Sequence, residues 1–127
     1  MRKYIFLDRK VSFIAFGKKH VPLIESNHIA MAKFGTLIQS AKPVLIEFFL
    51  DNELTQDNYE VLKTVAAALG DKATVIRIDT EQNNELAKAL RIKTNPTYII
   101  YKAEQMLWRQ PENHDANSLI NAVLKFV

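Results

Sequence analysis

The side chains that most often carry catalysis are absent or widely spaced in this chain of 127 residues. It contains no cysteine, which excludes a disulfide framework, a thiolate-ligated metal centre and every reaction that needs a thiol. Its three histidines, His20, His28 and His114, lie too far apart to show the spacing of a metal site. No Ser-His-Asp order, glycine-rich phosphate loop or pair of acids on one helix face can be assembled. The sequence therefore predicts no catalytic residue, no metal and no cofactor.

One polar cluster does lie where chemistry is common, between an apolar strand and a long helix. It consists of Asp51, Asn52, Glu53, Leu54 and Thr55. Asn52 and Thr55 could bind an anion at the helix N-terminus, or they could simply cap that helix. We favour capping, because the carboxylates of Asp51 and Glu53 would repel an anionic ligand.

The hydrophobic pattern predicts the elements that must position this cluster. Beginning at residue 21, it predicts the order β-α-β-α-β-α-β-β-α, with strands at 21–25, 44–50, 73–79, 97–102 and 106–110 and helices at 26–41, 54–69, 80–91 and from 115. Strand 44–50 is apolar on both faces except at Glu47. Such a strand is typical of the centre of a parallel or mixed sheet that helices cover. The length and this alternation predict one α/β domain.

The net charge of +3 is distributed unevenly along the chain. Residues 1–20 hold six basic residues against Asp8, a net charge of +5, and their apolar runs 4–7 and 11–16 favour a hairpin, with a helix as the alternative. We therefore predict a basic N-terminal extension at 1–20, with possible extra strands, and a domain at 21–127. A solvated extension is the favoured interpretation, and contact with nucleic acid or an anionic lipid surface is the alternative. With no apolar run of ~18 to 20 residues and no cleavage-site pattern, we expect a cytoplasmic protein.

Several segments resemble the thioredoxin superfamily. The family's KPVLVDFW is matched by Lys42-Pro43-Val44-Leu45-Ile46-Glu47-Phe48-Phe49, and its GIRSIPT by Arg91-Ile92-Lys93-Thr94-Asn95-Pro96-Thr97. Shorter matches between them are Gly70-Asp71-Lys72, Asp79 and Glu85-Leu86-Ala87-Lys88. The resemblance covers roughly residues 21–127. It implies a thioredoxin-like α/β fold, with a central mixed sheet flanked by helices and, in this chain, a basic N-terminal extension.

The resemblance also marks the position where this chain departs from the family. A thioredoxin has WCGPC between the strand and the long helix, where this chain has the polar cluster, and Asn52 and Thr55 stand nearest to the missing cysteines. The family's chemistry needs a thiolate that attacks a disulfide. Because an amide and an alcohol cannot replace a thiolate, the resemblance implies a redox-inactive protein without dithiol–disulfide oxidoreductase activity.

A buried charge pair is a second implication of the resemblance. Glu47 stands where thioredoxins carry a buried acid, and Arg77 stands where they carry the lysine that partners it. We expect an ion pair in the interior, on adjacent strands, with a structural role. The alternative is that Glu47 remains a proton-transfer carboxylate with a raised pKa.

A peptide-binding edge is the third implication. Pro96 aligns with the family's cis-proline, so Thr94, Asn95 and Pro96, together with Asp51, are candidates for pairing with an extended peptide. The alternative is that the proline is kept only for the geometry of the strand. The surface would include the loop 111–114, and the acidic residues at 51–55 would favour a basic or neutral segment. Trp108, in the family's last strand, is expected to pack in the core, and the alternative is a partly exposed contact residue.

Two functions from different classes follow. The leading hypothesis is a redox-inactive adaptor or chaperone-like module that binds a protein or peptide partner. The alternative is a glutathione-using or other non-dithiol enzyme on the same fold, in which Thr55 or Asn52 would orient the cofactor's thiol. The acidic cluster and the lack of a basic clamp for the carboxylates of glutathione favour the binding module.

Overall fold

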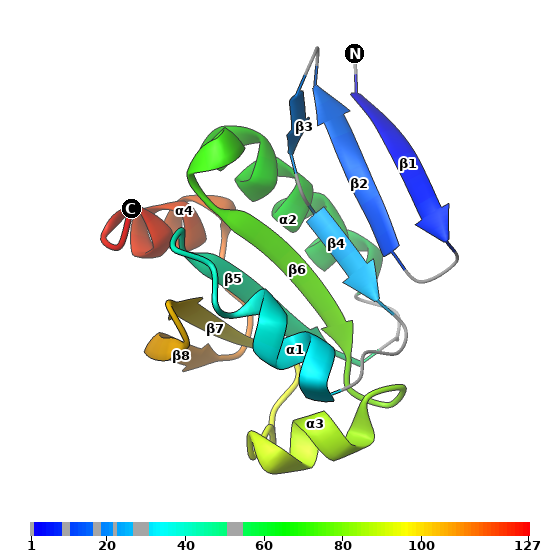
Figure 1. Ribbon diagram of the computed structural model, residues 1–127, viewed down its shortest axis with the longest axis vertical. Coiled ribbons are helices and arrows are strands. Elements are labelled where there is room, and N and C mark those ends of the chain that lie inside the picture. The colour runs from blue at the N-terminus through cyan, green and yellow to red at the C-terminus, as the bar shows by residue number, and fades with distance from the viewer. Residues whose placement is uncertain (1, 9–10, 17–18, 22, 27–30, 51–54) are drawn as a thin grey trace.

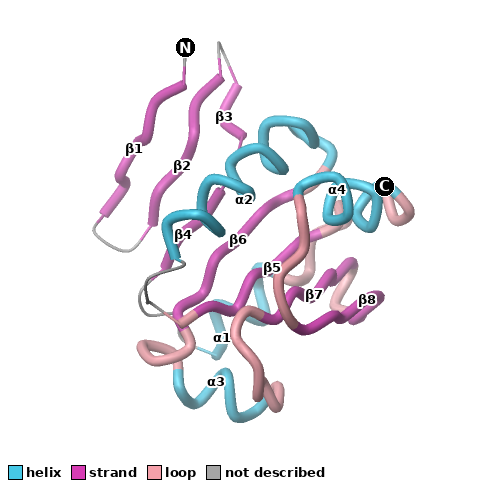
Figure 2. Tube along the Cα trace, turned by 180° about the vertical axis from the view of Figure 1, so that it is seen from behind, coloured by secondary structure: helices cyan, strands magenta, loops and turns pink. Residues whose placement is uncertain are grey.

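The computed structural model describes residues 2–8, 11–16, 19–21, 23–26, 31–50 and 55–127, and the side chains within 31–50 and 58–127. Its described strands form a three-stranded antiparallel sheet and a five-stranded mixed sheet. Helices lie on both faces of the five-stranded sheet (Figures 1 and 2). This is the mixed sheet flanked by helices that the resemblance implies.

The five-stranded sheet places the most apolar strand at its centre. Its order is β4 (Leu23–Ser26), β6 (Thr74–Asp79), β5 (Val44–Phe49), β7 (Thr97–Lys102) and β8 (Gln105–Pro111). Strands β4 and β5 run parallel to β6, whereas β7 runs antiparallel to β5 and to β8. Every residue of β5 is buried, as a strand covered by helices on both faces must be. The predicted central strand is confirmed.

The helices follow the predicted alternation, with differences at their ends. They are α1 (Met31–Leu37), α2 (Thr55–Leu69), the 3-10 turn η1 (Gly70–Lys72), α3 (Asn84–Ala89) and α4 (Ala116–Leu124). Helix α3 begins four residues later than predicted, because the carboxylate of Asp79 accepts the amides of Glu81 and Gln82 and holds a turn there. Helix α1 ends before the predicted residue 41, where the hydroxyl of Ser40 accepts the amide of Lys42. Within the described parts of the chain, no helix is long and apolar enough to cross a membrane.

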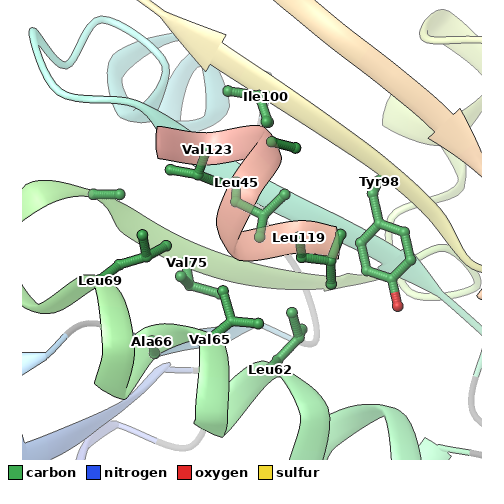
Figure 3. Close-up of a cluster of buried hydrophobic side chains, with 12 residues drawn as sticks. Leu45, Leu62, Val65, Ala66, Leu69, Val75, Tyr98, Ile100, Leu119 and Val123 are labelled. Atoms are coloured by element: carbon green, nitrogen blue, oxygen red, sulfur yellow. The ribbon is translucent and has the colours of Figure 1, made fainter. Parts of the chain in front are cut away.

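Two apolar clusters hold the helices against the sheet. The first lies between the sheet and helices α2 and α4, and Figure 3 shows Leu45, Leu62, Val65, Leu69, Val75, Ile100, Leu119 and Val123 meeting there. The second lies on the opposite face and includes Phe34, Ile46, Phe48, Ile76, Ile78, Leu86 and Ile99. Alternate residues of one strand face opposite sides of a sheet, so β5 and β6 contribute to both clusters.

The N-terminal extension forms the smaller sheet. Strand β1 (Arg2–Asp8) pairs antiparallel with β2 (Val11–Phe16), and β2 pairs with β3 (Lys19–Val21). The hairpin predicted from the two apolar runs is confirmed. The single strand predicted at 21–25 is instead divided between β3 and β4, which are separate strands in separate sheets. Strand β2 lies beside β4, so the extension adjoins the edge of the larger sheet (Figure 1).

Candidate functional site

A row of three polar side chains crosses the centre of the sheet. The strand registers set Glu47 of β5 opposite Arg77 of β6 on one side and opposite Tyr98 of β7 on the other. Arg77 Nε donates to Glu47 Oε1 at 2.7 Å, and the Tyr98 hydroxyl donates to Glu47 Oε2 at 2.8 Å. Each of the three residues is at most 1% exposed. The buried ion pair predicted from the resemblance is confirmed, and Tyr98 is a third member that the sequence analysis missed.

Aromatic rings enclose this row. The guanidinium carbon of Arg77 lies 3.9 Å from the ring centre of Phe49 and 5.2 Å from that of Tyr59. Such cation–π contacts stabilise a cation that is buried away from water. Burial raises the pKa of the Tyr98 phenol well above its usual value, and the Glu47 carboxylate raises it further. The Tyr98 phenol therefore stays protonated and donates a hydrogen bond to Glu47. Because each carboxylate oxygen of Glu47 already accepts a hydrogen bond, the arrangement supports a structural role for the row.

The polar cluster predicted at the start of the long helix lies mostly outside the described residues. Asp51, Asn52, Glu53 and Leu54 are not among them, so their predicted capping and contact roles stay predictions. Thr55 is the first residue of α2, which places the predicted helix start within one residue of the observed one.

The loop before β7 is fixed at several points. The Asn95–Pro96 peptide bond is cis. The hydroxyl of Thr80 lies 3.3 Å from the side-chain oxygen of Asn95, and the hydroxyl of Thr97 donates to the carbonyl of Thr94 at 2.5 Å. Thr94 and Asn95 are exposed, whereas Pro96 is buried. The surface that this loop offers is therefore formed by Thr94 and Asn95 and not by the ring of Pro96.

The backbone of Asn95 differs from that of its neighbours. Neither its N–H nor its C=O forms a hydrogen bond with any residue in the described part of the chain. The next carbonyl, that of Pro96, accepts the amide of Glu112 at 2.8 Å. This bond joins the Asn95 loop to the loop 111–114, the two segments that the sequence analysis assigned to one surface.

Beyond Glu112, the loop packs through His114. Its ring centre lies 5.7 Å from that of Tyr98 and 5.8 Å from that of Trp108, which is itself packed against the first apolar cluster. The carboxylate of Asp115 then accepts the amide of Ser118 at 2.8 Å, which caps the predicted last helix, α4, and lowers the pKa of Asp115. Among the described residues, no three His, Asp or Glu side chains gather as a metal site requires.

Most of the chain is similar in sequence to known proteins. The family model described as Thioredoxin matches residues 25–125. The chain is 31% identical over 102 residues to "Thioredoxin Y, chloroplastic" of Oryza sativa subsp. japonica, covering 79% of this chain and 61% of that protein. It is 29% identical over 92 residues to a thioredoxin-like protein of Synechocystis sp., covering 72% of this chain and 88% of that protein. The chain spans less than two thirds of the length of the plant relatives that it matches.

Solved structures agree on the fold. Chloroplastic thioredoxin z superposes with a TM-score of 0.68 at 21% identity, covering 78% of this chain and 91% of that one. A mutant thioredoxin from Halobacterium salinarum superposes with a TM-score of 0.70 at 20% identity, covering 78% and 87%. At these identities the likeness concerns the arrangement of the backbone.

Proposed function

This chain belongs to the thioredoxin family, and because it contains no cysteine we propose that it is a redox-inactive module that binds a protein or peptide segment. Its role would be that of an adaptor or a chaperone-like domain. Dithiol–disulfide exchange requires a thiolate nucleophile, which no residue here provides. Binding an extended segment requires only free backbone groups and neighbouring side chains.

The backbone of Asn95, an exposed residue whose N–H and C=O are unpaired among the described residues, carries this proposal. A donor and an acceptor on one exposed residue are the groups that an added strand uses for pairing. The loop can therefore accept an extended segment without breaking a described hydrogen bond.

The surroundings of Asn95 hold it in place. Thr80, whose hydroxyl lies near the Asn95 side chain, is buried and bonds to the carbonyl of Phe49 through both its hydroxyl and its amide. On the other side, the amide of Glu112 fixes the carbonyl of Pro96. A loop fixed by the ends of the central strands loses little conformational entropy on binding, which favours affinity.

An NMR titration tests the proposal. The probe is a protein kept permanently unfolded by chemical blocking of its own cysteines, because such a chain offers many extended segments. We expect saturable shifts of the amides of Thr94, Asn95 and Glu112, and none at Ala103 in the distant β7–β8 turn. Absence of binding would overturn the proposal. Binding confined to residues 2–21 would move the function to the N-terminal sheet, and saturable shifts with reduced glutathione would instead favour the enzyme.

A further inference from the structure

Unpaired positive charge gathers at the end of α3, next to the Asn95 loop. Lys88, Arg91 and Lys93 are exposed, and their side chains form no ion pair or hydrogen bond with any residue that the structure describes. The guanidinium of Arg109 on β8 adds a fourth charge, donating to the carbonyls of Leu90 and Arg91 at 2.7 and 2.8 Å. No acidic residue occurs from residue 86 to residue 103.

The backbone gives Arg91 an unusual position. The amide of Arg91 donates to the carbonyl of Lys88, and the amide of Ile92 donates to that of Ala87, the two bonds that end a helix in a Schellman motif. The central residue of this motif has a left-handed conformation and is usually glycine. Arg91 occupies it with a φ of 55°. A cation therefore stands at a position where glycine would be free of strain.

A second charged residue in this conformation lies on the other side of the loop. Glu112, whose amide binds the carbonyl of Pro96, has a φ of 69°. Two other non-glycine residues with positive φ, Ala103 and Glu104, form the turn between β7 and β8. The Asn95 loop thus follows the positively charged end of α3 in the chain, and at its other end the carbonyl of Pro96 binds the backbone of an acidic residue, Glu112.

On the basis of the proposed function, we infer that the bound segment is acidic where it passes Arg91 and Lys93. A carboxylate can pair with the guanidinium of Arg91 through two hydrogen bonds and with Lys93 as a point charge. Repulsion by Glu112 would fix the direction of the segment, with its acidic part at the α3 side. The basic or neutral preference predicted from Asp51 and Glu53, which lie outside the described residues, would apply to other parts of the segment.

An acidic peptide suits this surface better than a nucleic acid. A nucleic acid strand carries a phosphate at every nucleotide, so it needs continuous positive charge along its path. Here the unpaired cations are bounded by Glu85 on α3 and by Glu112 beyond Pro96. A segment with a short acidic stretch matches this limited patch of positive charge.

An array of immobilised peptides of random sequence, about ten residues long, tests the inference, because an extended peptide of that length is longer than any strand that the structure describes. It is probed with the unaltered protein, with the double variant Arg91→Gly/Lys93→Gln and with Lys72→Gln, a control that removes an exposed charge far along the chain. Glycine is unstrained at position 91, so the double variant keeps the fold. We expect the unaltered protein and the control to select peptides rich in Asp and Glu. The double variant should bind these about fivefold more weakly at low salt.

The outcomes separate the inference from the proposed function. Peptides bound without acidic enrichment, or enrichment that persists in the double variant, would overturn the inference and leave the binding function in place. No peptide bound by any form would overturn both. A single-stranded DNA oligonucleotide that binds more tightly than the best acidic peptide would assign the patch to nucleic acid and overturn the inference.

Discussion

Tyr98 of the Glu47 row lies three residues after Asn95 in the sequence, yet the polar groups of the row and of the Asn95 loop differ in burial and in hydrogen bonding. In the row, both carboxylate oxygens of Glu47 have a partner, and all three members are almost completely buried. In the loop, Asn95 is an exposed residue, and its backbone N–H and C=O have no hydrogen-bond partner among the described residues. The hydrogen bonds of the Glu47 row therefore connect strands β5, β6 and β7. The backbone groups of Asn95 remain available to bond with another molecule.

The contrast suggests different roles for the two regions in a chain that has no redox cysteines: the row contributes to stability, and the loop to the proposed binding. The Glu47 row can persist for structural reasons alone, because removing one member leaves a buried charge without its partner. The loop needs no thiol to bind a segment. Changes in the row should therefore act on the free energy of unfolding, whereas changes at the surface of the loop should act on binding.

Removal of one partner of the ion pair should give the largest effect. Arg77→Met leaves the carboxylate of Glu47 buried without its cation, and Glu47→Leu leaves the guanidinium of Arg77 without its anion. Each substitution should lower the free energy of unfolding by about 3–5 kcal/mol, measured by urea denaturation. The double variant should lose far less than the sum of the two. Single variants as stable as the unaltered protein would show that the pair does not form.

Loss of the Tyr98 hydroxyl should have a smaller effect on the same row. Tyr98→Phe removes one hydrogen bond to a charged acceptor and should cost about 1.5–3 kcal/mol in the same denaturation experiment. Tyr101→Phe is the matched control, since its hydroxyl donates to no residue in the described part of the chain. Equal losses in the two variants would contradict the assigned bond to Glu47.

The pH dependence of stability gives another test of the row. Burial raises the pKa of both Tyr98 and Tyr101 in the folded protein. Because their unfolded pKa values are about 10, stability should be unaffected by these phenols below that pH and should fall as the pH rises above it. Ultraviolet absorbance should show these two phenols ionising at a higher pH than tyrosine in the unfolded chain. Ionisation of all four tyrosines at about pH 10 in the folded protein would contradict the raised pKa of Tyr98 and Tyr101.

Relief of backbone strain at position 91, before the Asn95 loop, should give a modest increase in the free energy of unfolding. Arg91→Gly should raise the free energy of unfolding by about 1 kcal/mol, because glycine adopts the left-handed conformation without strain. Arg91→Ala is the matched control, since it removes the same charge and keeps the strain. Thermal or urea denaturation of the two variants should show the gain for glycine alone, and equal stability of both would contradict the assignment of the φ angle.

No measurable effect is expected in a disulfide-reduction assay. The chain has no thiol, so it should not raise the rate of insulin reduction by a chemical thiol above the uncatalysed rate. A thioredoxin with its cysteines serves as the positive control. Catalysis that remains proportional to the amount of highly purified protein would contradict the proposed redox-inactive function.

The central strand and the ion pair could be predicted from sequence for physical reasons. Strand β5 is apolar on both faces, as a short strand covered by helices on both sides must be, and the charge at Glu47 stands out within it. Tyr98 could not be assigned to the row in advance, because its place beside Glu47 depends on the register between β5 and β7. The one indication in the sequence was that Tyr98 lies in an apolar strand predicted to belong to the same sheet as the strand of Glu47.

The surface of the loop was harder to predict. Sequence similarity indicated Thr94, Asn95 and Pro96 as contact residues, but side-chain burial depends on the packing of neighbouring elements, and the structure exposes Thr94 and Asn95 and buries Pro96. The importance of Arg91 depends on its φ angle, which only the backbone shows. The short helix α3 also began later than its periodicity suggested, because the side chain of Asp79 competes for the backbone amides of the first turn.

The most direct test of the binding function uses the absence of cysteine. In Asn95→Cys the introduced thiol is unique, so an environment-sensitive fluorophore can be attached at the loop alone. Gln105→Cys, at an exposed position at the start of β8, carries the same label as the control. With the unfolded-protein probe, the label at position 95 should show a saturable change in emission and the label at position 105 should not. No change at position 95, while other parts of the protein bind the probe, would contradict the account.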